Sequence, residues 1–154
     1  MSWIAEGENQ GAIMHTLPGI GDRFLRLYDS FWALPHLPAS VLELCRLRLA
    51  QLHESRGDWE LEKHPVEPAK KAALRDWARD DRFSAGERAC LAFTEVHAMD
   101  AGAITDAQAE AVKTHYGDKG LVALAQALGV FDGMIRLGLL WGLSDQAGGD
   151  QHGH

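Results

Sequence analysis

Apolar residues recur at helical spacing along most of the chain. In the first such stretch, residues 22–33, the apolar positions three and four apart are Phe24, Leu27, Tyr28 and Phe31. This spacing puts them on one face of an α-helix. Pro35 and Pro38 follow, and proline cannot continue a helix because it lacks the amide hydrogen and clashes with the preceding turn. We therefore expect a first helix over 22–33.

A capping-box pattern, in which Ser or Thr is followed three residues later by Glu or Gln, marks further helix starts. The pairs are Ser40 with Glu43, Ser84 with Glu87, and Thr105 with Gln108. Each pair precedes an apolar-periodic segment, so helices are expected to begin at these positions. A short amphipathic helix is expected over 69–79, and Asp118 can cap the last helix.

Residues 121–143 form a strongly apolar segment that is long enough to cross a bilayer. Asp132 and Arg136 lie within it four residues apart, where they can pair on one helix face, and charges inside a bilayer are costly. We therefore predict a buried helix. Its small residues, which let a neighbouring backbone approach closely, are Gly129, Gly133, Gly138 and Gly142. This predicts a helix that takes part in an interface.

No stretch shows the sustained alternation or the Asn-Gly turns that strands and hairpins need. The expected fold class is therefore all-α, a compact bundle of about six helices. A chain of 154 residues has the size of one domain. We expect an N-terminal segment over 1–12, one helical domain over 13–144, and a flexible, polar, glycine-rich tail over 145–154.

Charge and cysteine usage narrow the function classes. Lys and Arg number 15 against 22 Asp and Glu, and the net charge of -7 repels nucleic-acid phosphates and anionic membrane surfaces. Cys45 and Cys90 form no C-x-x-C pair, so neither a disulfide framework nor a thiolate metal site is predicted. The opening residues carry acids where a signal peptide needs basic residues, so a cytoplasmic location is expected. No cofactor is expected.

The segment LPASVLELCRLRLAQL, residues 37–52, resembles the helix that opens the motif of the carboxymuconolactone decarboxylase and alkylhydroperoxidase D superfamily. The residues that match its E-L-x-x-L-R-x-A core are Glu43, Leu44, Leu47, Arg48 and Ala50. Residues 73–143 are similar to the second half of that family, and residues 15–28 to its opening. The resemblance implies a small all-α domain of the alkylhydroperoxidase D-like type that assembles into a trimer or hexamer, with the active site near subunit contacts.

In the peroxidase branch of that superfamily, the next helix carries C-x-x-C-x-x-x-H. One thiolate attacks the peroxide, the second cysteine resolves the product as a disulfide, and the His and an upstream Glu move protons. Aligned without gaps from Arg48, this chain has Ser55 and Asp58 at the cysteine positions and Glu62 at the histidine position. A hydroxyl without a base is no peroxide nucleophile near neutral pH, so thiol redox cycling is not expected.

In the decarboxylase branch the same place reads roughly C-E-Y-E-W-x-x-H, and two registers are open. Without gaps, Asp58 and Trp59 match its Glu-Trp. With a two-residue insertion, the residues from Asp58 to Glu60 match Glu-Tyr-Glu and His64 matches the His. On one continuous helix, Asp58 and Glu62 would share a face, and Glu60 and His64 would share another.

The candidate site residues follow from this alignment. The catalytic candidates are Asp58, Glu62, His64 and Glu43, and the substrate-binding candidates are Arg48, Trp59 and His53. A carboxyl or imidazole could move a proton while an arginine holds a substrate carboxylate. Each candidate also has a structural alternative: a solvated acid pair, a helix cap at Glu43, a structural ion pair of Arg48 with Glu43 or Asp132, surface histidines, and a core tryptophan.

Three functions stay open. The first is a carboxymuconolactone decarboxylase-like protein that acts by general acid/base chemistry on, or binds, a small organic acid without thiol redox cycling. The second is a catalytically inactive oligomeric binding or scaffold protein, since a fold does not fix a function. The third is peroxidase activity through Cys45 or Cys90, although Cys45 lies on the apolar stripe of its helix, as inert packing would. The expected partners are a small-molecule ligand and further copies of the chain.

Overall fold

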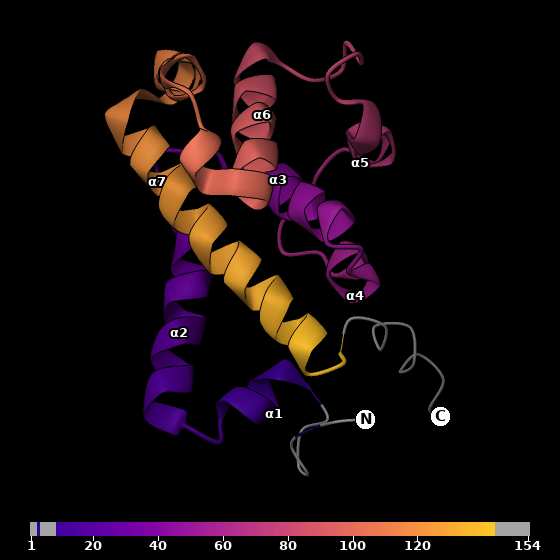
Figure 1. The fold of residues 1–154 in the computed structure, drawn as a ribbon, viewed down its shortest axis with the longest axis vertical. Helices are drawn as coiled ribbons and strands as arrows, with labels where there is room; N and C mark the ends of the chain where they lie inside the picture. The colour runs from indigo at the N-terminus through magenta and orange to yellow at the C-terminus, as the bar shows by residue number, and fades with distance from the viewer. Residues whose placement is uncertain (1–2, 4–8, 144–154) are drawn as a thin grey trace.

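The computed structural model describes residue 3 and residues 9–143, which fold into seven α-helices with no strand among them (Figure 1). Their bounds are α1 (Gln10–Met14), α2 (Pro18–Ser30), α3 (Ala39–Leu52), α4 (Arg56–Glu60), α5 (Pro68–Ala73), α6 (Ala85–Asp100) and α7 (Asp106–Leu140). The short 3-10 helices that follow α2, α5 and α6 are η1 (Phe31–Ala33), η2 (Leu74–Asp76) and η3 (Ala101–Ala103). The all-α prediction is confirmed. The tail expected over 145–154 lies outside the described residues.

Two of the three predicted capping boxes are confirmed. Ser84 and Thr105 each accept a hydrogen bond from the backbone three residues on, and Glu87 and Gln108 return one. The box predicted at Ser40 and Glu43 is wrong, because α3 begins at Ala39, so that Ser40 lies inside the helix, and the helix start has no side-chain cap. The carboxylate of Glu43 is used in the interior instead, as described below.

α7 crosses the whole molecule in Figure 1, with α3 and α6 packed against it. The helix is kinked at Gly117, whose φ of 70° and ψ of -177° interrupt the helical backbone. Residues other than glycine rarely adopt a positive φ, so a glycine is needed at this bend. The helical backbone is therefore interrupted immediately before Asp118, the residue predicted to cap the last helix. The segments on the two sides of this kink together form α7.

The core lies between α3, α6 and α7. Its fully buried apolar side chains include Leu42, Leu49, Leu91, Leu124, Leu128 and Phe131. Rings from α2 and η1 close it on one side: Tyr28 meets Phe131 edge-on at 5.4 Å between centroids, and Trp32 stacks on Phe131 at 5.1 Å. Burying each such side chain stabilises the fold by roughly 1.5–3 kcal/mol. The core therefore fixes the position of α3, which carries the residues that resemble the family motif.

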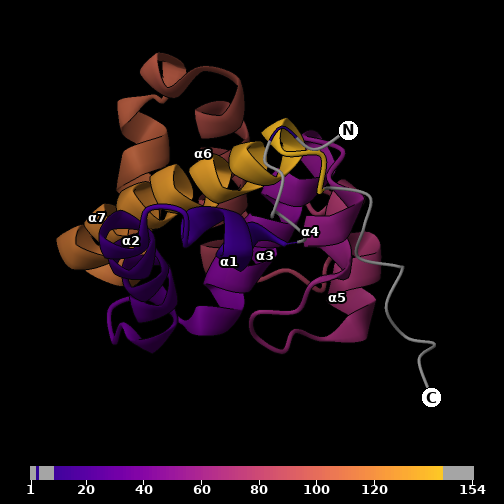
Figure 2. The same ribbon diagram turned by 90° about the horizontal axis from the view of Figure 1, so that it is seen from below.

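By length and composition, α7 is the one helix of the described residues that could cross a membrane. Core helices share this length and composition, and 44% of the most apolar part of α7 is buried. The pair predicted within it is confirmed, because Arg136 Nε donates to Asp132 Oδ2 at 2.7 Å. α4 and α5 lie on the side of α3 that faces away from α2 (Figure 2). Residues 61–67 connect these two helices.

Candidate functional site

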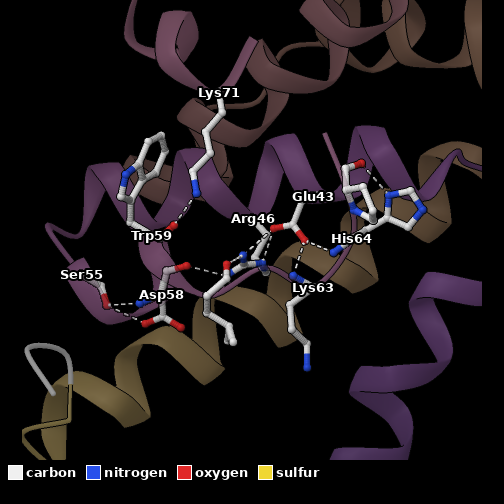
Figure 3. A network of polar contacts seen from close by, with 10 residues as sticks. Glu43, Arg46, Ser55, Asp58, Trp59, Lys63, His64 and Lys71 are labelled. Carbon is white, nitrogen blue, oxygen red and sulfur yellow. Dashed lines mark hydrogen bonds and ion pairs between the residues drawn. The ribbon is translucent and has the colours of Figure 1, made fainter. Parts of the chain in front are cut away.

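A buried ion pair ties the segment after α3 back onto α3 (Figure 3). Glu43 and Arg46 are both 1% exposed, and Arg46 Nε donates to Glu43 Oε1 at 2.7 Å. The other two guanidinium nitrogens donate to backbone carbonyls, Nη1 to Asp58 at 2.8 Å and Nη2 to Leu61 at 2.5 Å. All three nitrogens of Arg46 are therefore used within the protein.

The second carboxylate oxygen of Glu43 also has its hydrogen-bond partners within the protein. It accepts the backbone N–H of Lys63 at 2.8 Å and of His64 at 2.5 Å. A buried charge is costly unless it is paired and hydrogen-bonded, and here both conditions are met. The name Glu43–Arg46 clamp is used below for these two side chains together with the backbone groups of residues 58–64 to which they are hydrogen-bonded. The clamp leaves neither oxygen of Glu43 directed at solvent, so this carboxylate acts as a structural tie.

The clamp also explains why the predicted helix faces are wrong. α4 ends at Glu60, and Leu61 is extended, with φ of -69° and ψ of 129°. Its carbonyl turns to Arg46 and not to a helical partner. Asp58 and Glu62 therefore do not share a helix face, and neither do Glu60 and His64.

Ser55 and Asp58, at the cysteine positions of the family motif, contact each other. The Ser55 hydroxyl, in a residue only 1% exposed, donates to Asp58 Oδ2 at 2.5 Å, and Ser55 caps α4. Asp58 also faces α7, because a Cβ placed on Gly138 would lie 3.9 Å from its Oδ2. No imidazole takes part in this pair within the described structure, so Ser55 has no strong base to activate it as a nucleophile.

The remaining acids and His64 do not join this pair. Glu60 accepts a hydrogen bond from Arg56 at 2.7 Å. Glu62 is exposed, and no described residue bonds to it. The His64 ring contacts the carbonyl of Pro65, with 2.9 Å between Nδ1 and O. No three His, Cys, Asp or Glu side chains of the described residues converge as a metal site.

Arg48 lies elsewhere, in a tie between α3 and α6. Its Nε donates to Glu95 Oε1 at 2.8 Å, and Nη1 donates to Gln51 at 2.9 Å. Trp77 Nε1 donates to the same Glu95 oxygen at 2.7 Å. The ion pair of Arg48 with Glu43 or Asp132 that the sequence offered is wrong. Arg46 pairs with Glu43, and Arg136 and His53 pair with Asp132.

His53 joins the end of α3 to α7. Its Nε2 lies 2.5 Å from Asp132 Oδ1, and Arg136 binds the other oxygen of Asp132. Burial raises the pKa of Asp132, but the hydrogen bonds from Arg136 and His53 outweigh it and lower the pKa below its ordinary value. Asp132 is therefore a carboxylate near neutral pH. Glu43, Arg48 and His53 thus occupy three separate structural ties, and the candidate residues do not converge on one pocket.

An open cleft of about 510 Å³ lies beside α4, between the end of α3 and the segment formed by α5 and η2. We call it the Trp59 cleft. Its lining consists of Ala50, Gln51, Glu54, Ser55, Arg56, Trp59, Ala72 and Arg75. The lining carries two arginines and one glutamate, and Glu60, outside the lining, pairs with Arg56. Lys71 also lies outside the lining, with its Nζ 4.8 Å from the centre of the Trp59 ring, and it gives the region one excess positive charge.

A turn at Glu54 shapes this cleft. The N–H of Ser55 donates to Ala50 and the N–H of Glu54 to Gln51, at 2.9 and 3.1 Å, which is the Schellman pattern of a helix end. Glu54 has a φ of 54°, the conformation that glycine usually supplies in this pattern. A side chain there costs about 1 kcal/mol. The turn directs the chain from α3 into α4 and brings Trp59 to the cleft wall.

Arg75 is the cleft residue that no sequence motif marked. Its side chain is exposed on η2, and no described residue forms a hydrogen bond or ion pair with it. Arg56, by contrast, binds Glu60. The available sequence signal was only a basic residue beside the expected helix 69–79. Its place in the cleft depends on the packing of η2 against α3, which is a tertiary contact.

The two thiols are inert. Cys45 and Cys90 are fully buried, and burial raises the pKa of Cys45 to about 12 although a hydrogen bond from Thr94 opposes it. Burial also raises the pKa of Cys90, and the nearby Cys45 adds to this effect. Thiols with raised pKa values stay protonated near neutral pH and are poor nucleophiles. The structure agrees with the packing role inferred for Cys45.

No family model matches the chain, and no curated protein matches it. Membership of the superfamily therefore stays a prediction that depends on the residues quoted from the sequence.

Proposed function

We propose that the chain is a divergent carboxymuconolactone decarboxylase-like protein of the alkylhydroperoxidase D-like type. In this proposal it binds a small organic acid in the Trp59 cleft and carries out no thiol redox chemistry. The observation that carries the proposal is the lining of that cleft, which includes Arg75, Arg56 and Trp59. The planar fork of an arginine binds a carboxylate through two parallel hydrogen bonds, and an aromatic ring stacks well on tryptophan. A cyclic or aromatic monocarboxylic acid fits this lining best.

Size and charge support the same ligand class. A volume of about 510 Å³ lies within the range of roughly 300–1,000 Å³ that is usual for small-molecule sites. The excess positive charge attracts an anion, while the chain as a whole carries a net charge of -7. Because Arg56 already binds Glu60, Arg75, which no described residue pairs with, is the expected anchor for the carboxylate.

The geometry favours binding over catalysis. A general base must lie within hydrogen-bond reach of the proton it removes. Glu43 is enclosed in the clamp, and Asp58, which binds Ser55, is not part of the cleft lining. The protonated, buried thiols likewise argue against the peroxidase alternative. The second open function, a binding protein that has lost the family chemistry, is therefore the one we favour.

We also propose that the chain forms a homo-oligomer, a trimer or hexamer as the resemblance implies. Large apolar side chains are exposed on α2 and α7, including Ile20 at 66%, Val122 at 55% and Leu140 at 54%. Cβ atoms added at Gly129 and Gly133 would meet nothing within 4 Å, so a partner helix could approach α7 closely there. Light scattering at micromolar concentration should give an oligomer mass, and a monomer would contradict this proposal.

Titration of the full-length, ¹⁵N-labelled chain with sodium benzoate tests the acid-binding proposal. Benzoate should shift the Trp59 indole signal in a saturable way, and benzamide, which has the same ring without the charge, should bind more weakly. Replacing Arg75 with Ala should lower benzoate affinity about tenfold, because a hydrogen bond to a charged group contributes about 1.5 kcal/mol or more.

The matched control is Arg79→Ala, which removes the same charge from an exposed residue outside the cleft. Its benzoate affinity should equal that of the unaltered chain. Equal losses in the two variants would mean that benzoate responds only to overall charge. That result, or an unshifted Trp59 signal, would reject the proposal.

A further inference from the structure

A second cleft, of about 630 Å³, opens near the other end of α3. It lies between the starts of α3 and α6, the segment that leads into α5, and Tyr116 of α7. We call it the Tyr116 cleft. It shares no lining residue with the Trp59 cleft, so the two can bind ligands independently.

One wall of this cleft carries a fixed carboxylate. Glu87 is 7% exposed, and Lys70 Nζ donates to its two oxygens at 2.8 and 3.1 Å. The N–H of Ser84 donates to Glu87 Oε1 at 3.1 Å. Burial raises the pKa of Glu87, but these hydrogen bonds outweigh it and lower the pKa below its ordinary value. Glu87 is therefore charged near neutral pH, and Lys70 balances its charge.

Tyr116 also lines the cleft, and glycines make room for it. A Cβ on Gly86 would lie 2.5 Å from the Tyr116 hydroxyl oxygen, and a Cβ on Gly120 would lie 2.3 Å from Tyr116 Cβ. A side chain at either position would force the tyrosine to move. The kink at Gly117 immediately follows the tyrosine. Three glycines thus surround one aromatic residue in the cleft wall.

The hydroxyl of Tyr116 is free to bind a ligand. Burial raises the pKa of Tyr116 to about 12, with smaller contributions from Cys90, Glu87 and Cys45, so the phenol keeps its proton. No described residue forms a hydrogen bond with it, and the same holds for the exposed hydroxyl of Ser40 on the rim.

The charge of this cleft is opposite to that of the Trp59 cleft. Glu67 and Glu87 line it with only Lys70 to balance them, which leaves one excess negative charge. Glu67 is 71% exposed, and 3.9 Å separate its Oε2 from Lys70 Nζ. The remaining wall is apolar and includes Val41, Leu44 and Val66. A carboxylic acid would be repelled here, and a cation with an apolar body would be attracted.

We propose that the Tyr116 cleft binds a small organic monoamine with an apolar body. The ammonium group donates hydrogen bonds to Glu67 and to the hydroxyl oxygens of Tyr116 and Ser40, and the apolar body covers Val41 and Leu44. A single positive charge matches the single uncompensated carboxylate, whereas a diamine would place a second charge against Lys70. This inference does not depend on the acid-binding proposal, because no residue is common to the two clefts.

Two probes with the same ring and similar chain length, phenethylamine and phenylacetate, test it on the full chain by ¹⁵N–¹H NMR. Phenethylamine should shift the amides of Val66, Glu87 and Tyr116 and saturate, while phenylacetate should leave them unchanged. Glu67→Gln and Tyr116→Phe should each weaken phenethylamine binding about threefold to tenfold, as expected for one lost hydrogen bond. Asp81→Asn removes an exposed acid outside the cleft and should change nothing.

Equal shifts by both probes, or no shift of these amides by phenethylamine, would overturn the proposal. So would an unchanged phenethylamine affinity in Glu67→Gln, an exposed substitution that leaves the core intact. If benzoate still shifts Trp59 in that case, only the amine site is rejected. Loss of benzoate binding with intact phenethylamine binding would reject only the acid site.

Discussion

The Glu43–Arg46 clamp and the Trp59 cleft both involve the segment after α3, yet they use arginine in opposite ways. In the clamp, Arg46 is 1% exposed and all three nitrogens bind protein groups. In the cleft, Arg75 is exposed and no described residue binds it. An arginine with its donors satisfied holds a fold together, whereas an unpaired arginine beside an aromatic ring can hold a ligand.

The comparison also separates stability from function. Removing one partner of a buried ion pair leaves an unpaired charge in the interior, which is far more costly than losing an exposed charge. Changes in the clamp should therefore lower the free energy of unfolding, and changes in the cleft should lower ligand affinity. The predictions below test this division in order of expected size.

The largest effect is expected from Glu43→Ala. It should lower the free energy of unfolding by roughly 3–5 kcal/mol, because Arg46 and two backbone amides lose their partner. Urea unfolding followed by circular dichroism measures this loss. Glu62→Ala, the matched exposed acid, should change stability by less than about 0.5 kcal/mol. Similar losses in both variants would show that the clamp is not structural.

A smaller loss is expected from Arg48→Ala. The substitution leaves Glu95 without its ion pair and should cost about 1–3 kcal/mol in stability. Benzoate affinity should not change, since Arg48 does not line the cleft. Arg75→Ala should show the reverse, with stability unchanged and benzoate affinity reduced. A large drop in benzoate affinity for Arg48→Ala would restore the anchor role that the sequence suggested.

The pH dependence of stability should reveal the contacts that Asp132 makes with His53 and Arg136. Its pKa is lowered in the folded state, so its contribution is present above the unfolded pKa of 3.8 and is lost as the pH falls through the folded value. Between pH 5 and about pH 2.5 the unaltered chain should therefore lose more stability than Asp132→Asn. Parallel pH profiles of the two proteins would contradict this account.

The smallest effect concerns the turn that leads into the cleft. Both α3 and α7 end in the Schellman pattern, with Glu54 at φ 54° in one and Gly142 at φ 72° in the other. Glu54→Gly should raise the free energy of unfolding by about 1 kcal/mol, because glycine adopts this conformation without steric cost. Thermal unfolding would measure it. A destabilised variant would mean that the Glu54 side chain makes compensating contacts.

Much of the fold could be predicted from local patterns. Helix periodicity and the capping boxes at Ser84 and Thr105 depend only on neighbouring residues, and the structure confirms them. The box at Ser40 failed because Glu43 binds Arg46, at the local i,i+3 spacing of a helix, and also binds the amides of a later segment, which no local rule describes. The same tertiary contacts end α4 at Glu60.

The candidate site was less predictable, for the same reason. The alignment directed attention to residues 55–64, and Trp59 of that segment borders a cleft. It pointed to Arg48, five residues after Glu43, whereas the partner is Arg46, three residues after Glu43 at the spacing of helix neighbours. It also could not mark Arg75, which reaches the cleft because η2 packs against α3.

The most direct test of the central claim is to locate benzoate on the chain by intermolecular NOEs from its ring protons. We predict NOEs to the indole protons of Trp59 and to the side chain of Arg75, and none to His64 or Lys63 beside the clamp. NOEs that cluster at His64 and Lys63, with none to Trp59, would contradict the account. They would mean that the clamp opens to bind the acid and that Glu43 and Arg46 belong to the functional site.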